Sequence, residues 1–166
     1  MTAITLIIDG PSGAGKTTLA ASLEAAWPQE RTVFVLHMDD LYPGWQGLRE
    51  ASGIVANTVI PARTADEDVT VNSWDWAAGQ PGHAIVIPAN VDLIIEGCGA
   101  LTKASARGAT ASIWLDAEEG IRKSRALSRG NEDFEAHWDE WDVQFQQFVA
   151  EHDPRALASV TVGAKR

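Results

Sequence analysis

The sequence predicts an α/β protein in three layers, with a five-stranded parallel sheet between two layers of helices and a small β-hairpin beside it. Five short apolar runs of strand length alternate with helical patterns, which is typical of a parallel sheet with right-handed crossovers. The first run is continuous and rich in β-branched residues, as in a strand buried on both faces. The expected strands lie at 3–8, 32–36, 91–95, 111–115 and 159–162.

The segments between these strands predict the helices and the hairpin. Helical patterns are expected at 16–27, 48–60, 100–107, 118–129 and 131–151. The pattern at 48–60 is the weakest, because Gly53 and several β-branched residues interrupt it. Residues 39–47 read as a loop by their Pro and Gly content. An alternating run at 69–76 and an apolar run at 84–87, joined by turn-forming residues, indicate an antiparallel hairpin.

The composition fits one folded domain and limits its partners. The chain has 166 residues, 45% hydrophobic and 22% charged, so we expect a single domain over residues 1–166. Its net charge of −10 would repel nucleic acids and anionic membranes. No apolar run approaches the roughly 18 residues of a membrane span. The start lacks a signal-peptide pattern and Cys98 is the single cysteine, so we expect a cytoplasmic protein whose oligomeric state stays open.

Residues 10–17, which read GPSGAGKT between the first strand and the first helix, match G-x-x-x-x-G-K-[ST] in full and predict a P-loop NTPase fold. Their glycines allow main-chain N–H groups to converge on a phosphate, where the helix dipole also acts. Lys16 would reach the β- and γ-phosphates of a bound nucleotide as a catalytic residue, and Thr17 would bind Mg²⁺. A turn that only needs tight packing would explain the glycines but not Lys16 followed by Thr17. The predicted nucleotide-binding residues are Gly10, Ser12, Gly13, Ala14, Gly15, Lys16, Thr17 and Thr18.

Two acids stand at the ends of expected strands, where a parallel sheet has its ligand crevice. Asp39 follows the second strand and could accept the proton of an attacking hydroxyl. The alternative for Asp39 is a solvated cap of the following segment. Glu96 ends the third strand in a Walker B arrangement and would hold Mg²⁺ together with Thr17. The alternative for Glu96 is a surface acid at a strand end.

Three arginines share one face of the helix expected at 118–129. Arg122, Arg125 and Arg129 follow at spacings of three and four. They could stabilise the charge that spreads over a transferring phosphoryl group, and we favour Arg125 and Arg129 for this role. They could also form salt bridges with the acid-rich stretch that follows, and both uses are compatible.

Several aromatic residues could form a surface that binds the molecule accepting the phosphoryl group. Trp74 and Trp76 would face one side of a strand and Asp75 the other. With Tyr42 and Trp45 they could contact a base or a sugar, although a core that covers the sheet edge is an equal alternative. Trp138 and Trp141 are expected to pack in a helix stripe, and Cys98 to be a small buried residue. The predicted substrate-binding residues are Asp40, Tyr42, Trp45, Arg63, Trp74, Asp75 and Trp76.

The P-loop, Asp39-Asp40-Leu41-Tyr42, Trp74-Asp75-Trp76, Ile95-Glu96-Gly97 and Arg125-x-x-x-Arg129 occur in the order found in uridine kinase-like P-loop kinases, which the chain resembles up to about Gly130. That group includes relatives of phosphoribulokinase and pantothenate kinase. The resemblance implies ATP and Mg²⁺ as cofactors, Asp39 as the general base, and a helical lid at about 122–135 that carries Arg125 and Arg129. Asp40 departs from the small residue usual after the base, and residues 134–151 match nothing in the well-studied members.

The function predicted from these observations is ATP-dependent phosphoryl transfer to a hydroxyl of a small metabolite, with a nucleoside as the favoured acceptor. A nucleoside monophosphate kinase is one alternative, and it would need cations for the acceptor phosphate, for which Arg49 and Arg63 are the nearby candidates. A nucleotide-binding regulatory protein with little kinase activity is the other, with the acidic and aromatic helix at 134–151 as its interaction surface.

Overall fold

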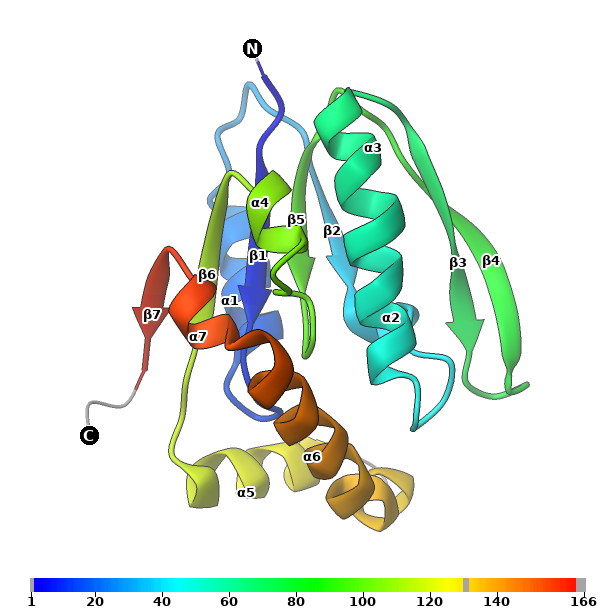
Figure 1. Ribbon diagram of the computed structural model, residues 1–166, viewed down its shortest axis with the longest axis vertical. Helices are drawn as coiled ribbons and strands as arrows, with labels where there is room; N and C mark the ends of the chain where they lie inside the picture. Colours follow the sequence, from blue (N-terminus) through cyan, green and yellow to red (C-terminus); the bar gives the residue numbers. More distant parts are fainter. Residues whose placement is uncertain (1, 130–131, 164–166) are drawn as a thin grey trace.

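The computed structural model describes residues 2–129 and 132–163, without the side chains of Arg129, Glu132 and Asp133. Strands and helices alternate along most of the chain (Figure 1). In order, the elements are β1 (Thr5–Asp9), α1 (Lys16–Ala25), β2 (Val33–His37), the 3₁₀ turn η1 (Met38–Asp40), α2 (Leu48–Ile54), the π-helical η2 (Val55–Val59), α3 (Ile60–Ala65), β3 (Val69–Asp75), β4 (Gln80–Ile87), β5 (Asp92–Glu96), α4 (Ser105–Gly108), β6 (Ala111–Leu115), α5 (Glu119–Arg129), α6 (Glu132–His152), α7 (Pro154–Leu157) and β7 (Val160–Val162).

The predicted five-stranded parallel sheet is confirmed. Its strand order is β2-β5-β1-β6-β7, and every pairing is parallel. Because all strands run the same way, their carboxyl ends meet at one edge. The last residues of β1, β2 and β5, which are Asp9, His37 and Glu96, therefore lie close together at that edge, with His37 and Glu96 in register.

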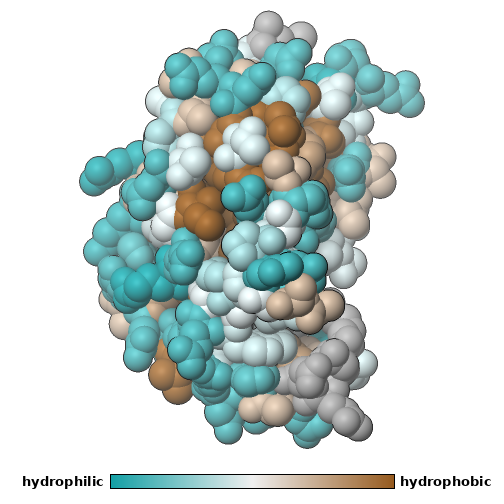
Figure 2. All heavy atoms as spheres, turned by 90° about the vertical axis from the view of Figure 1, so that its right-hand side faces the viewer, coloured by the Kyte–Doolittle hydropathy of each residue, from teal (hydrophilic) through white to brown (hydrophobic). Residues whose placement is uncertain are grey.

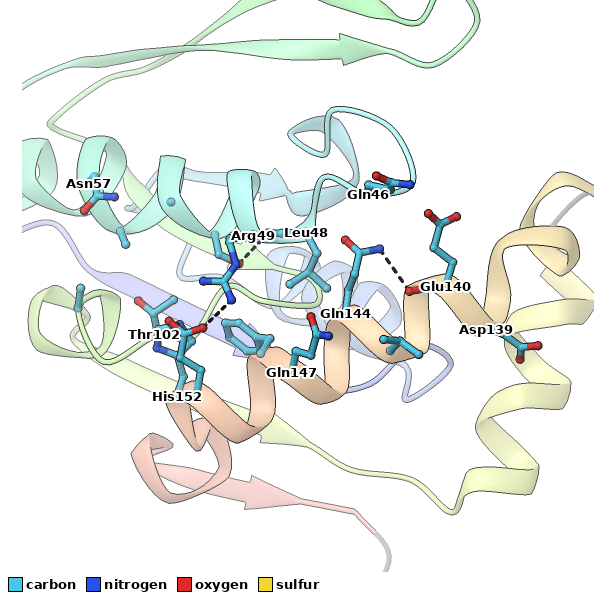
Figure 3. A pocket seen from close by; sticks show the side chains of 17 residues that line it. Gln46, Leu48, Arg49, Asn57, Thr102, Asp139, Glu140, Gln144, Gln147 and His152 are labelled. Atoms are coloured by element: carbon cyan, nitrogen blue, oxygen red, sulfur yellow. Dashed lines mark hydrogen bonds and ion pairs between the residues drawn. The ribbon is translucent and has the colours of Figure 1, made fainter.

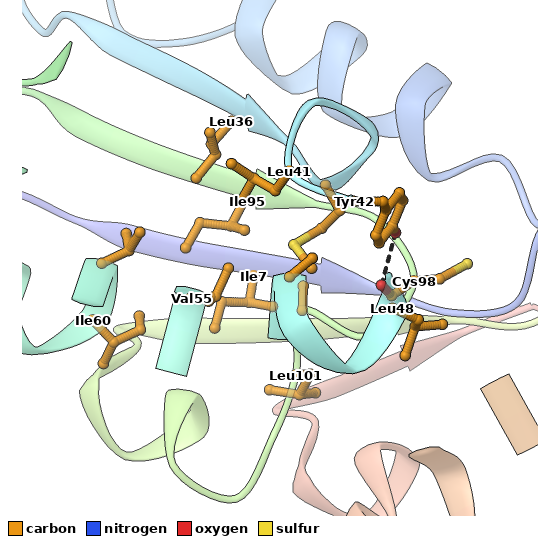
Figure 4. Close-up of a cluster of buried hydrophobic side chains, with 14 of the residues drawn as sticks. Ile7, Leu36, Leu41, Tyr42, Leu48, Val55, Ile60, Ile95, Cys98 and Leu101 are labelled. Atoms are coloured by element: carbon orange, nitrogen blue, oxygen red, sulfur yellow. Dashed lines mark hydrogen bonds between the residues drawn. The ribbon is translucent and has the colours of Figure 1, made fainter. Parts of the chain in front are cut away.

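Two apolar cores lie on the two faces of the sheet. Ile8 and Ile94 pack against α1 on one face, whereas Ile7 and Ile95 join the larger core on the other. That larger core contains Leu48 and Val55 from the helix at 48–65 and Phe145 and Phe148 from α6, and Figure 4 shows its centre. The alternation of side chains along β1 and β5 accounts for this division, since successive residues face opposite sides of a strand.

Two helical predictions change in length. The helix expected at 48–60 continues to residue 65 through the π segment η2. Val55, Val59 and Ile60 are buried in the core, and this packing outweighs their weak helix propensity. The helix expected at 100–107 is reduced to α4 at 105–108. Thr102 and Ser105 exchange side-chain and main-chain hydrogen bonds of 2.8 and 3.0 Å, which hold residues 102–105 in a turn that leads into α4. The sequence predicted neither this late start nor α7.

The hairpin of β3 and β4 forms a separate two-stranded sheet beside the helix at 48–65. Val69, Val71 and Ser73 alternate onto the buried side of β3, and the pairing shifts in register between Asn72 and Trp74. On the face seen in Figure 2, apolar side chains form a small area among polar ones, and Val86 is 55% exposed.

Among the described residues, no helix combines the length and apolarity needed to cross a membrane.

Candidate functional site

The P-loop joins β1 to α1 at the carboxyl edge of the sheet. Gly10, Gly13 and Gly15 have φ angles of 153°, 80° and 99°, which favour glycine. A Cβ at Gly10 would also collide with the main-chain carbonyl of Leu115, and one at Gly13 with that of Arg122. The glycines therefore give the loop its shape and also allow β6 and α5 to pack directly against it.

A buried carboxylate fixes the start of this loop. Asp9 accepts hydrogen bonds from the main-chain N–H groups of Gly10 at 2.6 Å, Gly99 at 3.1 Å and Leu101 at 2.8 Å. Burial raises the pKa of Asp9 to about 6, against the lowering effect of these donors and of Lys16. The sequence analysis assigned Asp9 no role, because its acceptor function depends on a turn that lies 90 residues further along the chain.

The reactive side chains of the P-loop lie beside β5. Lys16 is buried, and its Nζ donates to the carbonyl of Pro11 at 2.9 Å and to Cys98 Sγ at 3.4 Å. The hydroxyl of Thr17 donates to Glu96 Oε1 at 3.1 Å. Cys98 is buried, as expected, and burial raises the pKa of its thiol. The structure thus brings Thr17 and Glu96 together, as the sequence predicted.

This pair of oxygens has the chemistry and the spacing that Mg²⁺ requires. Neighbouring ligands in an octahedral shell with bonds of about 2.0–2.1 Å lie about 3 Å apart. Thr17 Oγ1 and Glu96 Oε1 are 3.1 Å apart. Within the described residues, no three His, Cys, Asp or Glu side chains gather as a metal site. Mg²⁺ usually takes several of its ligands from phosphate and water, so two protein oxygens suffice for such a site.

A cavity of about 740 Å³ opens over the P-loop and joins most of the predicted site residues. The predicted residues in its lining are Ser12, Gly13, Gly15, Lys16, Thr17, Asp39, Tyr42, Trp45, Trp76 and Glu96. The lining residues that the sequence analysis did not assign to the site are Ala77, Gly97, Cys98, Ala126, Phe134 and Trp141. Gly10, Ala14 and Thr18 belong to the loop and the first turn of α1 but not to this lining.

Asp39 lies in the turn η1 directly after β2 and faces the cavity. The surrounding protein raises the pKa of its carboxyl, as does the neighbouring Glu96, while Lys16 lowers it. The side chain is nevertheless exposed to solvent through the open cavity, which reduces the size of this shift. A carboxylate with a raised pKa and access to the cavity can accept a proton from a hydroxyl.

Aromatic rings form the wall opposite the P-loop. The ring of Trp45 stacks on His137 with centroids 4.7 Å apart, and it contacts Trp76 at 5.0 Å and Phe134 at 5.7 Å. The Trp76 indole Nε1 donates to the main-chain oxygen of Asp39 at 3.0 Å. The hairpin therefore contributes one aromatic ring to the wall and ties that ring to the turn that carries Asp39.

Helix α6 takes part in the site, which the sequence analysis missed. Trp138 and Trp141 are buried, as expected for a packing stripe. Trp141 also donates from Nε1 to Ser12 Oγ at 3.1 Å and meets the ring of Tyr42 edge-on at 4.7 Å. Tyr42 is itself buried and donates to the carbonyl of Cys98 at 2.8 Å. The apolar stripe on α6 was the available signal, but only the fold shows that it meets the P-loop.

The arginines of α5 divide into different environments. Arg122 is buried, lies 3.4 Å from Asp142 on α6, and has its guanidinium 5.7 Å from the centroid of the Trp138 ring. This is the predicted salt bridge to the acid-rich helix. Arg125 is exposed on the same helix. The side chain of Arg129 lies outside the described residues, so the lid at 122–135 stays a prediction.

Four predicted substrate contacts are not part of this cavity. Arg63 is the clearest correction: its guanidinium donates to the carbonyls of Pro88, Ala89 and Val91 at 2.7–3.0 Å, at the amino edge of the sheet. The reason is length, because the helix from Leu48 carries Arg63 roughly 22 Å away at 1.5 Å per residue. The others are Asp40, Trp74 and Asp75.

The geometry of the hairpin explains two of these absences. Asp75 accepts the N–H groups of Ala77 and Ala78 at 3.0 and 2.9 Å, so its carboxylate closes the hairpin turn. Trp74 is half-buried within β3, whereas Trp76 lies beyond the end of that strand. The expectation that Trp74 and Trp76 share one face of a strand is therefore wrong, and Trp76 alone of the two lines the cavity. Asp40 is exposed at the end of η1.

A second groove of about 850 Å³ lies between the helix at 48–65 and α6 (Figure 3). It contains none of the predicted site residues. Arg49 spans it and pairs with Glu151 at 2.7 Å. Arg49 and Arg63 were the cations considered for an acceptor phosphate, and the structure places both away from the P-loop cavity.

Comparisons with known proteins agree with this architecture. No protein-family model matches the chain, and no curated protein matches it significantly. The chain is similar to the structure of a possible uridine kinase from Bacillus stearothermophilus, with a TM-score of 0.67 and 19% identity over 97% of this chain and 89% of that one. It is also similar to a putative fructose transport system kinase from Silicibacter sp. TM1040, with a TM-score of 0.58 and 20% identity over 97% and 90% of the two chains. The chain therefore has the fold of the P-loop kinases.

Proposed function

We propose that the protein is an ATP-dependent kinase that phosphorylates a hydroxyl of a small acceptor without a phosphate of its own, with a nucleoside as the favoured acceptor. One observation carries this proposal: the P-loop with Lys16 and the carboxylate of Asp39 face the same cavity, with the Thr17–Glu96 pair in its lining. Phosphoryl transfer to an alcohol needs these groups in one place. The two similar structures, a possible uridine kinase and a putative fructose transport system kinase, support a hydroxyl acceptor.

Each group has a separate task in this reaction. Main-chain N–H groups of the P-loop and Lys16 bind the β- and γ-phosphates of ATP. Thr17 and Glu96 would hold Mg²⁺, which neutralises charge on the phosphate oxygens when it is bound. Asp39 accepts the proton of the attacking hydroxyl, and its raised pKa suits that role. Arg125 and Arg129 are proposed to close over the phosphates.

The lining of the cavity favours an acceptor that is uncharged. Trp45, Trp76 and Phe134 offer flat apolar surfaces for a planar ring. Lys16 is the only cation among the described lining residues, and it belongs to the P-loop. A nucleoside monophosphate would need a second cation for its own phosphate, since leaving that charge unpaired is costly. We therefore favour a nucleoside over its monophosphate.

The proposal is tested by measuring whether ATP consumption requires an added acceptor, and whether this consumption is lost in the Asp39→Asn variant. Nucleosides and sugars are added singly to the protein with ATP and Mg²⁺, and ADP formation is measured. We expect turnover to require an acceptor and to fall about 1,000-fold in Asp39→Asn, because the amide cannot take the proton. Binding of a non-hydrolysable ATP analogue should persist.

A matched control is Asp66→Asn, at the left-handed end of the helix at 48–65, where asparagine fits and no site residue lies. This variant should keep full turnover. Wild-type rates in Asp39→Asn would remove Asp39 as the base. ATP binding without acceptor-dependent turnover across the panel would instead favour the nucleotide-binding regulatory protein.

A further inference from the structure

The carboxylate of Glu96 contacts His37 at a shorter distance than it contacts Thr17. His37 is the last residue of β2 and pairs in register with Glu96 on the neighbouring strand β5. Its Nδ1 lies 2.6 Å from Glu96 Oε1. The same oxygen accepts the hydroxyl of Thr17 at 3.1 Å. His37 and Thr17 therefore hold one oxygen of this carboxylate from two directions.

The Glu96 carboxylate depends on these two contacts for its orientation. Its side chain is 4% exposed, so little water reaches it. Lys16 donates to Pro11 and Cys98 instead. In the part of the chain that the structure describes, the hydrogen bonds to Glu96 Oε1 come from Thr17 and His37. A glutamate has three rotatable side-chain bonds, and a second donor on the same oxygen restricts the last of them.

We propose that His37 is a positioning residue of the magnesium site, which through Nδ1 holds Glu96 beside the Thr17 hydroxyl so that both oxygens are in place when Mg²⁺ and nucleotide bind. Partners that orient a metal ligand in this way are common in metal sites. The role does not depend on the charge of the ring, because both the Nδ1–H tautomer and the imidazolium donate from Nδ1. The proposal rests on the proposed function, since it presumes that Thr17 and Glu96 serve Mg²⁺.

The experiment measures metal binding directly rather than turnover. Mn²⁺ replaces Mg²⁺ and is titrated by electron paramagnetic resonance into the protein saturated with a non-hydrolysable ATP analogue. His37→Ala should weaken Mn²⁺ binding to the complex by about 10- to 100-fold. His37→Asn should recover most of this loss, because its side-chain amide can donate from nearly the position of Nδ1. Analogue binding without metal should be equal in all variants.

The matched control is His83→Ala, which removes a histidine that contacts Ser73 in the hairpin at 3.0 Å, away from the cavity. It should bind Mn²⁺ like the wild type. Should His37→Ala not fold, His37→Leu fills the space without a donor and serves in its place.

The outcomes separate the two proposals. Wild-type affinity in His37→Ala, or an equal loss in His37→Ala and His37→Asn, would overturn the positioning role and leave the kinase proposal intact. If the wild-type complex itself does not bind Mn²⁺, the proposed magnesium site fails, and with it both proposals.

Discussion

The two edges of the parallel sheet use carboxylates in opposite ways. At the amino edge, Asp92 of β5 receives the guanidinium of Arg31, the indole N–H of Trp27 at 2.8 Å and the main-chain N–H of Ile4 at 2.7 Å. At the carboxyl edge, Asp9 is held by main-chain N–H groups, and Glu96 by Thr17 and His37. One edge pairs its buried acid with a permanent cation, whereas the acids of the other edge are held by main-chain N–H groups, a hydroxyl and a histidine.

The pKa values of the two aspartates express this difference. The hydrogen bonds and charge of Arg31 lower the pKa of Asp92 to about 2. Burial raises the pKa of Asp9 to about 6. The ionised form of Asp92 therefore stabilises the fold. The ionised form of Asp9 instead lowers the free energy of unfolding. Charge at the amino edge therefore serves the fold, whereas the proposed function would use the charge of Glu96 at the carboxyl edge.

The largest expected effect is on catalysis, in Glu96→Gln. The amide keeps the size of the side chain but removes the negative charge that Mg²⁺ requires, so acceptor-dependent turnover should fall about 1,000-fold. The free energy of unfolding should change by no more than about 1 kcal/mol, because the amide oxygen can still accept the hydrogen bonds of Thr17 and His37. Steady-state kinetics and urea denaturation measure the two quantities. A large loss of stability with little loss of turnover would reverse our division between the edges.

The next largest expected effect is a loss of stability in the Asp92→Asn variant. This change leaves the Arg31 guanidinium without its anion in a mostly buried position, and should lower the free energy of unfolding by about 3 kcal/mol. Turnover per folded molecule should stay unchanged, since the residue lies at the opposite edge from the P-loop. Urea denaturation at neutral pH gives the stability, with Asp66→Asn as the control. A selective change in KM for ATP would contradict this assignment.

The smallest effect is a difference in pH dependence. The pKa of Asp9 in the folded protein lies above the usual 3.8. Its favourable contribution to the free energy of unfolding is therefore present below about pH 4 and is lost as pH rises toward about 6. The folded pKa of Asp92 is depressed, so its contribution is present above about pH 4 and is lost as pH falls toward 2. Asp9→Asn should therefore flatten the stability curve by about 2 kcal/mol between about pH 4 and 6, because a change of one in pKa corresponds to about 1.4 kcal/mol. Urea denaturation across this range measures it, and an unchanged slope would exclude Asp9 as the cause.

Local patterns in the sequence were sufficient for the P-loop and for most of the sheet. The strand at 111–115 has the predicted bounds. Thr17 meets Glu96 as expected, because the P-loop after β1 and the end of β5 lie at the same edge of one parallel sheet. The contact between His37 and Glu96 required the strand order, which places β2 next to β5. That order is a property of the whole fold and has no local signature.

Long-range geometry also decided the remaining differences. Arg63 follows the loop at 39–47 closely in sequence, but an uninterrupted helix carries it to the other edge of the sheet. Trp141 is distant in sequence, yet α6 returns across the sheet and places its indole on Ser12. Neither position follows from composition or spacing, because both depend on the direction in which a helix crosses the sheet.

The close approach of other main-chain atoms to Gly10 and Gly13 bears on how this loop would change during evolution. Any side chain at these two positions would strike the carbonyls of Leu115 and Arg122 whether or not a phosphate is ever bound. A descendant that lost its chemistry would still be obliged to keep both glycines in order to fold. Main-chain crowding does not constrain Lys16 and Thr17 in this way. These two positions would therefore distinguish a descendant that keeps the proposed chemistry from one that has lost it.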